Sequence, residues 1–222
     1  RDKTLNDREI ARAIRTIAAN PGTIDRVFVG NEAVGVRSEL TGREVSDYIK
    51  RVKAAIDNPA VQVGTAEVWP TWLTETELAD GADFVGIHLL PYWEGVSYDK
   101  SMEYITSSFD QIAKLYPDKK IVIGETGWPS DGRVKRGSVP SPAFEAAFLR
   151  KFFELAERKN YDYYVMEAYD QPWKGAAGHE GAVGAFWGML DADGNAKFNL
   201  SGPLSSFGEW KVFAAVAAGL TF

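Results

Sequence analysis

The sequence predicts an α/β protein built on a parallel sheet. Short runs rich in β-branched and aromatic residues alternate with longer segments of helical period, which is typical of βα units. Several of these runs are apolar on both faces, as parallel strands are when helices cover both sides of the sheet. No internal repeat, low-complexity stretch or linker-like change of composition interrupts the chain, so one domain is expected.

The strands and helices are predicted from runs and capping signals. Five strands are expected at Arg26–Asn31, Val61–Glu67, Asp83–Leu90, Lys120–Glu125 and Tyr163–Tyr169. Four helices are expected over Asn6–Asn20, Thr41–Ile56, Asp99–Tyr116 and Ser141–Leu155. Thr41 and Glu44 have the spacing of a capping box, and Ser141 before Pro142 is typical of a helix start. The region Asp170–Ser201 is predicted to be a long loop that carries a small hairpin.

Composition excludes several classes of function. The chain has 222 residues, with 25 Lys and Arg against 31 Asp and Glu, and its net charge of −6 gives no basic surface for nucleic acid. It has no Cys and only two His, which excludes thiolate zinc sites and multi-histidine metal clusters. The run Asp191–Asn195 lacks the register of a calcium loop and is predicted to be a turn. We therefore expect no metal and no cofactor, and chemistry that depends on carboxylates.

Glutamates stand at the ends of the predicted strands. Glu32, Glu67 and Glu125 lie at or just after the carboxyl ends of three strands, and Glu167 is expected inside the last one. Ligands bind at this edge of parallel sheets, so the carboxylates should converge there. A single such glutamate would be explained by exposure to water, but a group of four is less easily explained in that way. Paired carboxylates are what glycoside hydrolysis requires, and cation binding is the competing use.

Aromatic residues favour a sugar ligand. Tyr92 and five tryptophans lie just beyond strand ends, where they could stack on the apolar faces of sugar rings. The tryptophans are Trp69, Trp72, Trp93, Trp128 and Trp173. The sequence contains no GxSxG motif, phosphate loop or dinucleotide fingerprint, so acyl transfer, phosphoryl transfer and hydride transfer have no support.

Three strings of residues resemble family 17 glycoside hydrolases, which comprise β-1,3-glucanases and β-1,3-glucanosyltransferases. They are VFVGNE at 27–32, GETGWPS at 124–130 and EAYDQPWK at 167–174, in the family's order and spacing. The resemblance implies a (β/α)8 TIM barrel of which only strands four to eight and their helices are present here. Residues 1–205 would form this five-strand catalytic part, and residues 206–222 a terminal helix or the start of a membrane-anchoring segment.

The resemblance also implies roles for single residues. Glu32 would be the general acid/base and Glu125 the nucleophile of a retaining double displacement that uses no cofactor. Asn31 would contact the sugar 2-hydroxyl, Tyr92 would lie near the nucleophile, and Glu167 and Lys174 would form a polar pair. The full set of expected substrate contacts is Asn31, Glu67, Trp69, His88, Tyr92, Trp93, Trp128, Glu167, Trp173 and Lys174.

The expected partner is a β-glucan oligosaccharide or polysaccharide, and the sequence does not separate hydrolysis from chain transfer. The strings at 67–72 and 88–93 look closest to bacterial members, some of which are joined to membrane-embedded β-glucan synthases. With the uncharged run Val212–Phe222, this suggests a periplasmic or extracellular protein, fused or tethered to such a synthase. Two alternatives stay open, namely a non-catalytic β-glucan-binding domain and a glycosidase of the same clan that acts on mannan or cellulose.

Overall fold

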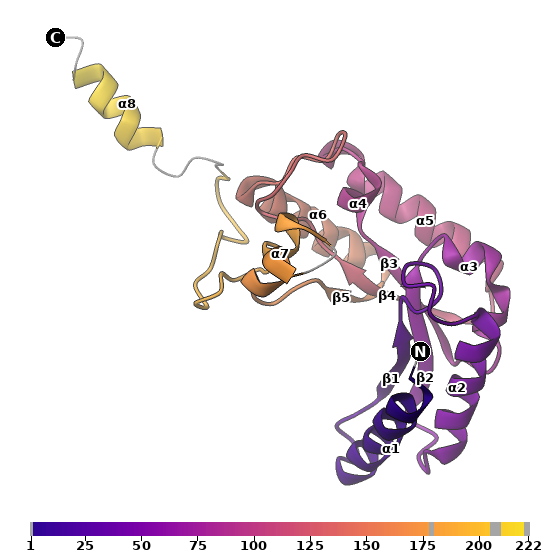
Figure 1. Ribbon diagram of the computed structural model, residues 1–222. Coiled ribbons are helices and arrows are strands. Elements are labelled where there is room, and N and C mark those ends of the chain that lie inside the picture. Colours follow the sequence, from indigo (N-terminus) through magenta and orange to yellow (C-terminus); the bar gives the residue numbers. More distant parts are fainter. Residues whose placement is uncertain (1, 178–179, 205–209, 220–222) are drawn as a thin grey trace. The chain divides into compact units, whose positions relative to one another are not determined.

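A computed structural model describes residues 2–177, 180–204 and 210–219 (Figure 1). The chain divides into two compact units. The first contains Arg1–Leu89, Ile105–Thr126 and Asn160–Tyr164, and includes nearly all of the sheet. The second contains Leu90–Tyr104, Gly127–Lys159 and Val165–Phe222.

The first unit is built on a five-stranded sheet. Its strands are β1 (Arg26–Asn31), β2 (Gln62–Val68), β3 (Phe84–Leu89), β4 (Lys120–Thr126) and β5 (Asp162–Val165). They lie in the order β1-β2-β3-β4-β5, and β1 with β2, β2 with β3 and β3 with β4 are parallel pairs. A doubly wound sheet reverses its strand order at a switch point, whereas a (β/α)8 barrel adds each strand beside the one before it. The sequential order therefore confirms the predicted partial barrel.

Side-chain contacts between the first and last strands show that the sheet is curved. The Arg26 guanidinium of β1 donates to both carboxylate oxygens of Asp162 in β5, at 3.2 and 2.6 Å. The rings of Phe28 and Tyr164 meet edge to face with centroids 5.7 Å apart. Strands at opposite ends of a flat five-stranded sheet would lie about 19 Å apart, too far for these contacts.

Helices cover the sheet as the apolar periodicity predicts. In the first unit they are α1 (Lys3–Ala19), α2 (Gly42–Ala55), α3 (Thr71–Thr74) and the 3-10 turn η1 (Thr76–Ala79), and α5 spans Ser101–Leu115. The predicted capping box of α2 is confirmed, since the Thr41 hydroxyl accepts from the Glu44 N–H and the Glu44 carboxylate accepts from the Thr41 N–H. Val45, Ile49 and Val52 of α2 are buried on the face toward β1 and β2.

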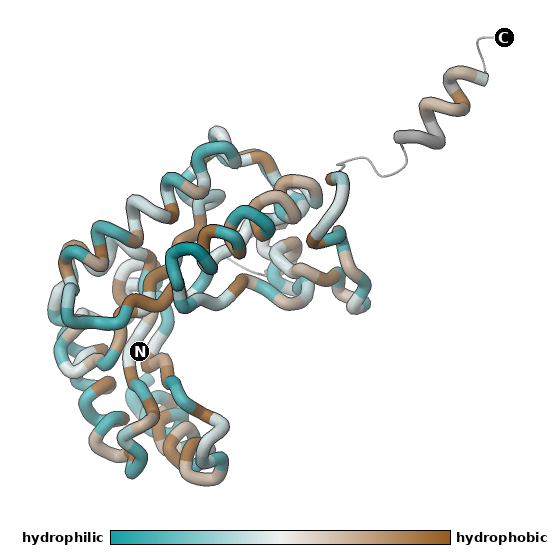
Figure 2. Tube along the Cα trace, turned by 180° about the vertical axis from the view of Figure 1, so that it is seen from behind, coloured by the Kyte–Doolittle hydropathy of each residue, from teal (hydrophilic) through white to brown (hydrophobic). Residues whose placement is uncertain are grey.

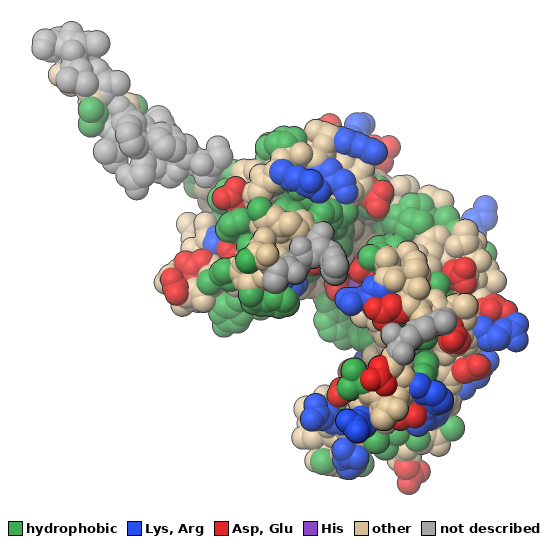
Figure 3. All heavy atoms as spheres, viewed as in Figure 1, with side chains coloured by type: hydrophobic (Ala, Val, Ile, Leu, Met, Phe, Trp, Pro, Cys, Tyr) green, Lys and Arg blue, Asp and Glu red, His purple; other side chains and the backbone are tan. Residues whose placement is uncertain are grey.

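The core of the first unit is apolar and closely packed. All six residues of β3 are buried, and so are Val63, Val122 and Ile123 of the neighbouring strands. Brown apolar and teal polar residues alternate along the tube in Figure 2. Charged side chains of both signs are mixed over the visible surface of this unit (Figure 3), so no single-sign field marks a polyanion site there.

The second unit is mostly helical. It contains α4 (Pro91–Glu94), η2 (Tyr98–Lys100), α6 (Pro142–Lys159), α7 (Pro172–Ala177), η3 (Ala182–Ala185) and α8 (Trp210–Gly219). The predicted start of α6 is confirmed, because the Ser141 hydroxyl accepts from the Phe144 N–H at 3.0 Å. The predicted turn after Leu190 is confirmed as well, since the N–H of Asp191 donates to the Asn195 carbonyl and Leu190 bridges Ala196 antiparallel.

The last strand is shorter than predicted. The expected range Tyr163–Tyr169 is wrong at its end, since β5 stops at Val165 and Glu167 lies outside the strand. The backbone of Glu167 bonds to the loop instead, donating to the Trp187 carbonyl and accepting from the Met189 N–H, both at 2.9 Å. Apolar runs do not show where a strand exchanges one backbone partner for another.

Of the predicted terminal segment 206–222, the structure describes the helix α8, and residues 206–209 and 220–222 lie outside the described residues. No helix among the described residues is both long enough and apolar enough to cross a membrane.

Candidate active site

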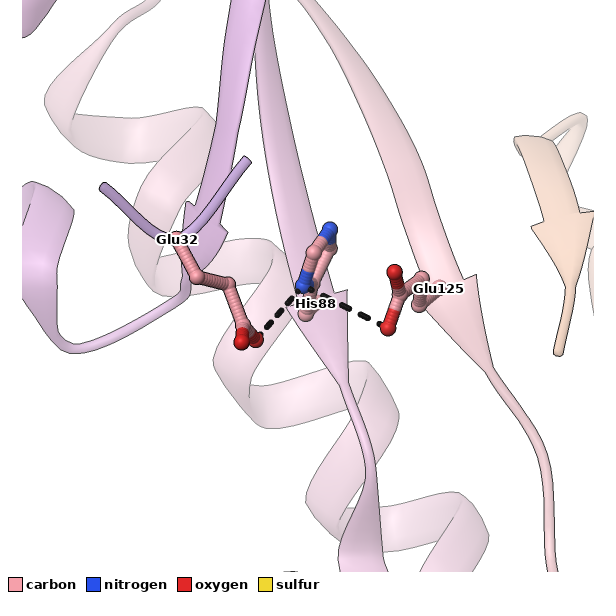
Figure 4. Close-up of side chains that lie close together, drawn as sticks. All are labelled: Glu32, His88 and Glu125. Atoms are coloured by element: carbon pink, nitrogen blue, oxygen red, sulfur yellow. Dashed lines mark hydrogen bonds and ion pairs between the residues drawn. The ribbon is translucent and has the colours of Figure 1, made fainter. Parts of the chain in front are cut away.

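Three side chains of the first unit meet at the carboxyl ends of the strands (Figure 4). Nδ1 of His88 lies 2.9 Å from Oε1 of Glu32 and 3.6 Å from Oε2 of Glu125. One carboxylate oxygen of each glutamate and one imidazole nitrogen all lie within 4.8 Å of one another. The His88 side chain is 1% exposed, whereas those of Glu32 and Glu125 are 19% and 30% exposed and remain accessible to a ligand.

The end of β1 is shaped to present Glu32. The parallel register with β2 is irregular between Phe28 and Asn31, and Gly30 has a φ of +86°. Glu32 follows with a φ of +53°, a left-handed conformation that is rare for a residue with a side chain. Its N–H donates to the Ala66 carbonyl of β2 at 2.9 Å. An irregularity of this kind redirects the side chain that follows it, here toward the sheet's carboxyl edge.

His88 lies between the glutamates because of a second irregularity. The register of β3 and β4 shifts between Ile87 and His88, so that His88 is paired with Glu125. A Cβ on Gly124 would lie 2.9 Å from Cδ2 of the His88 ring, closer than van der Waals contact allows. The glycine before Glu125 therefore provides the space that the imidazole occupies.

Glu67 is placed differently from the other two glutamates. It is fully buried in β2, where its Oε1 accepts from the Val34 N–H at 2.8 Å and its Oε2 from the Gly35 N–H at 3.0 Å. Burial raises the pKa of the Glu67 carboxyl, although both N–H donors oppose the increase. The predicted sugar contact of Glu67 stays a prediction, and the contacts that the structure shows are with backbone.

The arrangement of Glu32 and Glu125 suits covalent glycoside chemistry. Retaining glycosidases hold their two carboxyl groups about 5–5.5 Å apart, and inverting enzymes hold them about 6.5–9.5 Å apart to admit a water. One carboxylate oxygen of Glu32 and one of Glu125 lie no more than 4.8 Å apart, which is compatible with the separation in retaining enzymes. Glu32, His88 and Glu125 could also ligate a metal ion, and they are the only such group in the described part of the chain. The expectation of no metal stays a prediction.

Two more predicted contacts lie near this edge of the first unit. Asn31 is the last residue of β1 and is exposed. Trp69 follows β2 and is partly exposed, and its N–H donates to the His88 carbonyl at 3.4 Å. Trp72, by contrast, is fully buried in the core, where its indole N–H donates to the Gly86 carbonyl at 2.8 Å.

In the second unit, three of the predicted aromatic contacts pack together. Tyr92 is fully buried, and its hydroxyl donates to the Arg133 carbonyl at 2.7 Å. Its ring meets those of Trp93 and Trp128 edge to face. Trp128 is 1% exposed, whereas Trp93 is partly exposed with Nζ of Lys135 5.0 Å from its ring centroid, a contact that no sequence signal indicated.

The other predicted contacts of the second unit lie after β5. Glu167 and Lys174 form an ion pair within this unit. Trp173 on α7 is 64% exposed, the largest exposure among the large apolar side chains described. A sugar contact by any of these residues stays a prediction, and Trp173 has the most open ring for it.

Comparison with known proteins gives the family. The domain described as the BtgE/BtgC glycoside hydrolase domain matches residues 1–188. The chain belongs to this family. The first unit, with the proposed carboxylate pair, lies entirely inside the matched range. Family membership confirms the predicted glycoside hydrolase class.

Similar proteins and a similar solved structure support the same family. A glucan 1,3-beta-glucosidase of Arthroderma benhamiae is 27% identical over 83% of this chain and 64% of the relative, and one of Saccharomyces cerevisiae is 27% identical over 80% and 62%. A family 17 β-1,3-glucanosyltransferase of Rhizomucor miehei matches with a TM-score of 0.78 and 28% identity, over 90% of this chain and 73% of that one. The resemblance to family 17 is thus confirmed. The chain spans less than two thirds of these curated relatives, and the closeness to bacterial members stays a prediction.

Proposed function

We propose that the protein is a retaining glycosidase or transglycosylase that acts on β-1,3-glucan. The observation that carries the proposal is the pair of partly exposed carboxylates, Glu32 and Glu125, whose oxygens approach within 4.8 Å at the sheet's carboxyl edge. A structural role alone would not require two carboxylates to stand this close, because like charges at short distance oppose each other.

In the first half-reaction, a carboxylate oxygen of Glu125 attacks the anomeric carbon. The glycosidic bond breaks, and Glu32 donates its proton to the departing oxygen. In the second half-reaction, Glu32 accepts a proton from the incoming hydroxyl, whose oxygen displaces Glu125 from the sugar. Water as the incoming group gives hydrolysis, and a glucan hydroxyl gives chain transfer.

His88 supports the proton transfer by holding Glu32. With Nδ1 as the donor, Oε1 of Glu32 accepts its hydrogen bond, and Oε2 is left to carry the proton that passes to the departing oxygen. The same hydrogen bond can therefore persist through both half-reactions, because it does not use the proton that Glu32 transfers. This contact fixes the rotamer of the acid/base at the buried edge of the site.

The substrate class is inferred from the relatives. Two of them are glucan 1,3-beta-glucosidases, and an active-site mutant of the Rhizomucor miehei glucanosyltransferase was solved in complex with laminaritriose. The exposed ring of Trp173 offers stacking surface of the kind that sugars use. These observations support a β-1,3-linked glucan chain as substrate.

The test is mass spectrometry of the products that the full-length protein forms from laminaripentaose. Shorter oligomers alone indicate hydrolysis, and oligomers longer than the substrate indicate transfer. Mixed-linkage glucan and mannan are tested alongside. If laminaripentaose stays unchanged, the proposal is contradicted. A product from mannan alone would favour a glycosidase of another specificity.

Location outside the cytoplasm and attachment to a membrane glucan synthase are further parts of the proposal. Support comes from the chemistry, since a polymeric glucan is met where it is exported. Fractionation of cells that express the full-length protein tests this, and recovery in the cytoplasm would contradict it.

A further inference from the structure

Two consecutive residues of β2 hold the backbone around Glu32. The Ala66 carbonyl accepts the N–H of Glu32 itself at 2.9 Å. The next residue, Glu67, turns its carboxylate to the loop that follows and accepts the N–H groups of Val34 and Gly35 at 2.8 and 3.0 Å. Ala66 thus holds the amide of Glu32 itself. Glu67 holds the amides of the residues two and three positions after Glu32.

This support is placed where the backbone needs it. The left-handed conformation of Glu32 is unfavourable for an L-residue and persists only when its surroundings impose it. The Arg37 N–H donates to the Glu32 carbonyl at 3.0 Å, which closes a turn over residues 32–37. The carboxylate of Glu67 accepts from the middle of that turn, at Val34 and Gly35.

A carboxylate suits this place because it only accepts hydrogen bonds. Each oxygen of Glu67 takes one N–H, whereas an amide would offer one oxygen and one NH₂ group, and the NH₂ would face an N–H donor. The loop lies so close to the start of α3 that a Cβ on Gly35 would be 2.0 Å from Oγ1 of Thr71. The loop therefore has little room to move away from a mismatched donor.

We propose that Glu67 is a positioning residue for Glu32, and that it acts through the loop backbone. The inference rests on the proposed function, because it assumes that Glu32 is the acid/base. Both carboxylate oxygens of Glu67 are occupied by backbone N–H groups, and the side chain is fully buried. Because the side chain is fully buried, a sugar hydroxyl could reach this carboxylate only if the residues around it moved.

The role of Glu67 has a kinetic signature. General acid catalysis matters most when the leaving group is poor, as the hydroxyl of a sugar is. An activated leaving group such as 2,4-dinitrophenolate departs without a proton, so cleavage of its glycoside depends little on Glu32. Displacement of Glu32 should therefore slow cleavage of an oligosaccharide far more than cleavage of an activated aryl glycoside.

The experiment measures kcat/KM of the full-length protein on laminaripentaose and on 2,4-dinitrophenyl β-laminaribioside. Glu67→Gln should lower the value for laminaripentaose by roughly 10- to 100-fold, and that for the aryl glycoside by less than about threefold. Glu32→Gln should change the two values in the same unequal way, with a larger loss. The matched control is Asp83→Asn, because Asp83 accepts the Val63 N–H at 2.9 Å at the opposite end of the sheet. This control should leave the ratio of the two values unchanged.

An equal loss on both substrates with a raised KM would overturn the inference and make Glu67 a sugar contact. Unchanged values on both would overturn it as well. If Glu67→Gln does not fold, Glu67→Asp carries the test, since it keeps the acceptor and shortens its reach, and it should show the same pattern to a smaller extent. Failure of the proposed function looks different, because then the wild-type protein would cleave neither substrate or Glu32→Gln would leave the ratio unchanged.

Discussion

Nδ1 of His88 lies 2.9 Å from Oε1 of Glu32, although β3, which contains His88, is not a neighbour of β1, which Glu32 follows. β2 lies between β1 and β3, and the imidazole reaches past it to the carboxylate. His88 also stands 3.6 Å from Glu125 of the adjacent β4. One buried imidazole therefore bonds to one carboxylate and lies beside the other, and its removal should disturb the pair.

His88→Ala should reduce kcat on laminaripentaose by about 10- to 100-fold, because a small misplacement of a catalytic group has an effect of that size. It should also lower the free energy of unfolding by about 1–3 kcal/mol, since it removes a buried hydrogen-bonded group. Steady-state kinetics and urea denaturation measure the two effects. Gly124→Ala offers a second approach, because its Cβ would press on the ring without removing a functional group. Full activity in both variants would contradict the role of His88.

Glu125→Gln should abolish turnover, with a loss of at least about 10⁴-fold, because it removes the nucleophile and leaves the site's shape nearly unchanged. Binding of laminaritriose should persist, which isothermal titration calorimetry would measure. A non-catalytic glucan-binding domain would show no turnover before or after the change. Retention of wild-type turnover in this variant would exclude Glu125 as nucleophile.

A buried carboxylate of the second unit should make stability depend on pH. Burial raises the pKa of Glu145 to about 8 from its ordinary value of 4.5, although Nζ of Lys197 lies 3.1 Å from its Oε2 and opposes the increase. At pH values between these two pKa values, Glu145 is protonated in the folded state and ionised in the unfolded state. The contribution of Glu145 to stability therefore falls as pH rises through that window. The loss is complete above the folded pKa.

Glu145→Gln tests this dependence by removing the titrating group. Near pH 5 the variant should melt close to the wild type, since Glu145 is protonated there and Gln is similar in shape. At pH 9 the variant should be more stable than the wild type, by a few kcal/mol. Melting curves of both proteins from pH 5 to pH 9 give the difference. If the difference in stability between the two proteins stays constant with pH, or changes in the opposite direction, the raised pKa of Glu145 is contradicted.

The contact between the edge strands should contribute to the stability of the curved sheet. Arg26 is 9% exposed and lies 2.6 Å from Asp162, which also pairs with Lys120. Arg26→Ala should lower the free energy of unfolding by roughly 2–4 kcal/mol, because it leaves a partly buried carboxylate with one partner fewer. A double-mutant cycle with Asp162→Asn measures the coupling, and a coupling near zero would show that the pair does not hold the strands together.

The sequence predicted much of the fold because local signals were strong. The capping residues Thr41 and Ser141 predicted where two helices begin, and apolar runs predicted the first four strands within one or two residues. The end of β5 at Val165 was not predictable, since its cause is a loop contact with Trp187 more than twenty residues later.

The site, too, was predictable only in part from the sequence. Glu32 and Glu125 were identified as a pair from their motifs. The place of His88 between them depends on register irregularities that no motif encodes. The hydrogen bonds from Val34 and Gly35 to Glu67 join a side chain to backbone N–H groups more than thirty residues away, and backbone groups carry no signal in the sequence.

The most direct test of the central claim is to trap the covalent intermediate with an activated 2-deoxy-2-fluoro-β-laminaribioside and to locate the label by peptide mass spectrometry. We expect one glycosyl group, attached to the peptide that contains Glu125, and none when Glu125→Gln is treated in the same way. A label on another carboxylate would contradict it. So would an inverted anomeric configuration in the first product from laminaripentaose, followed by proton NMR.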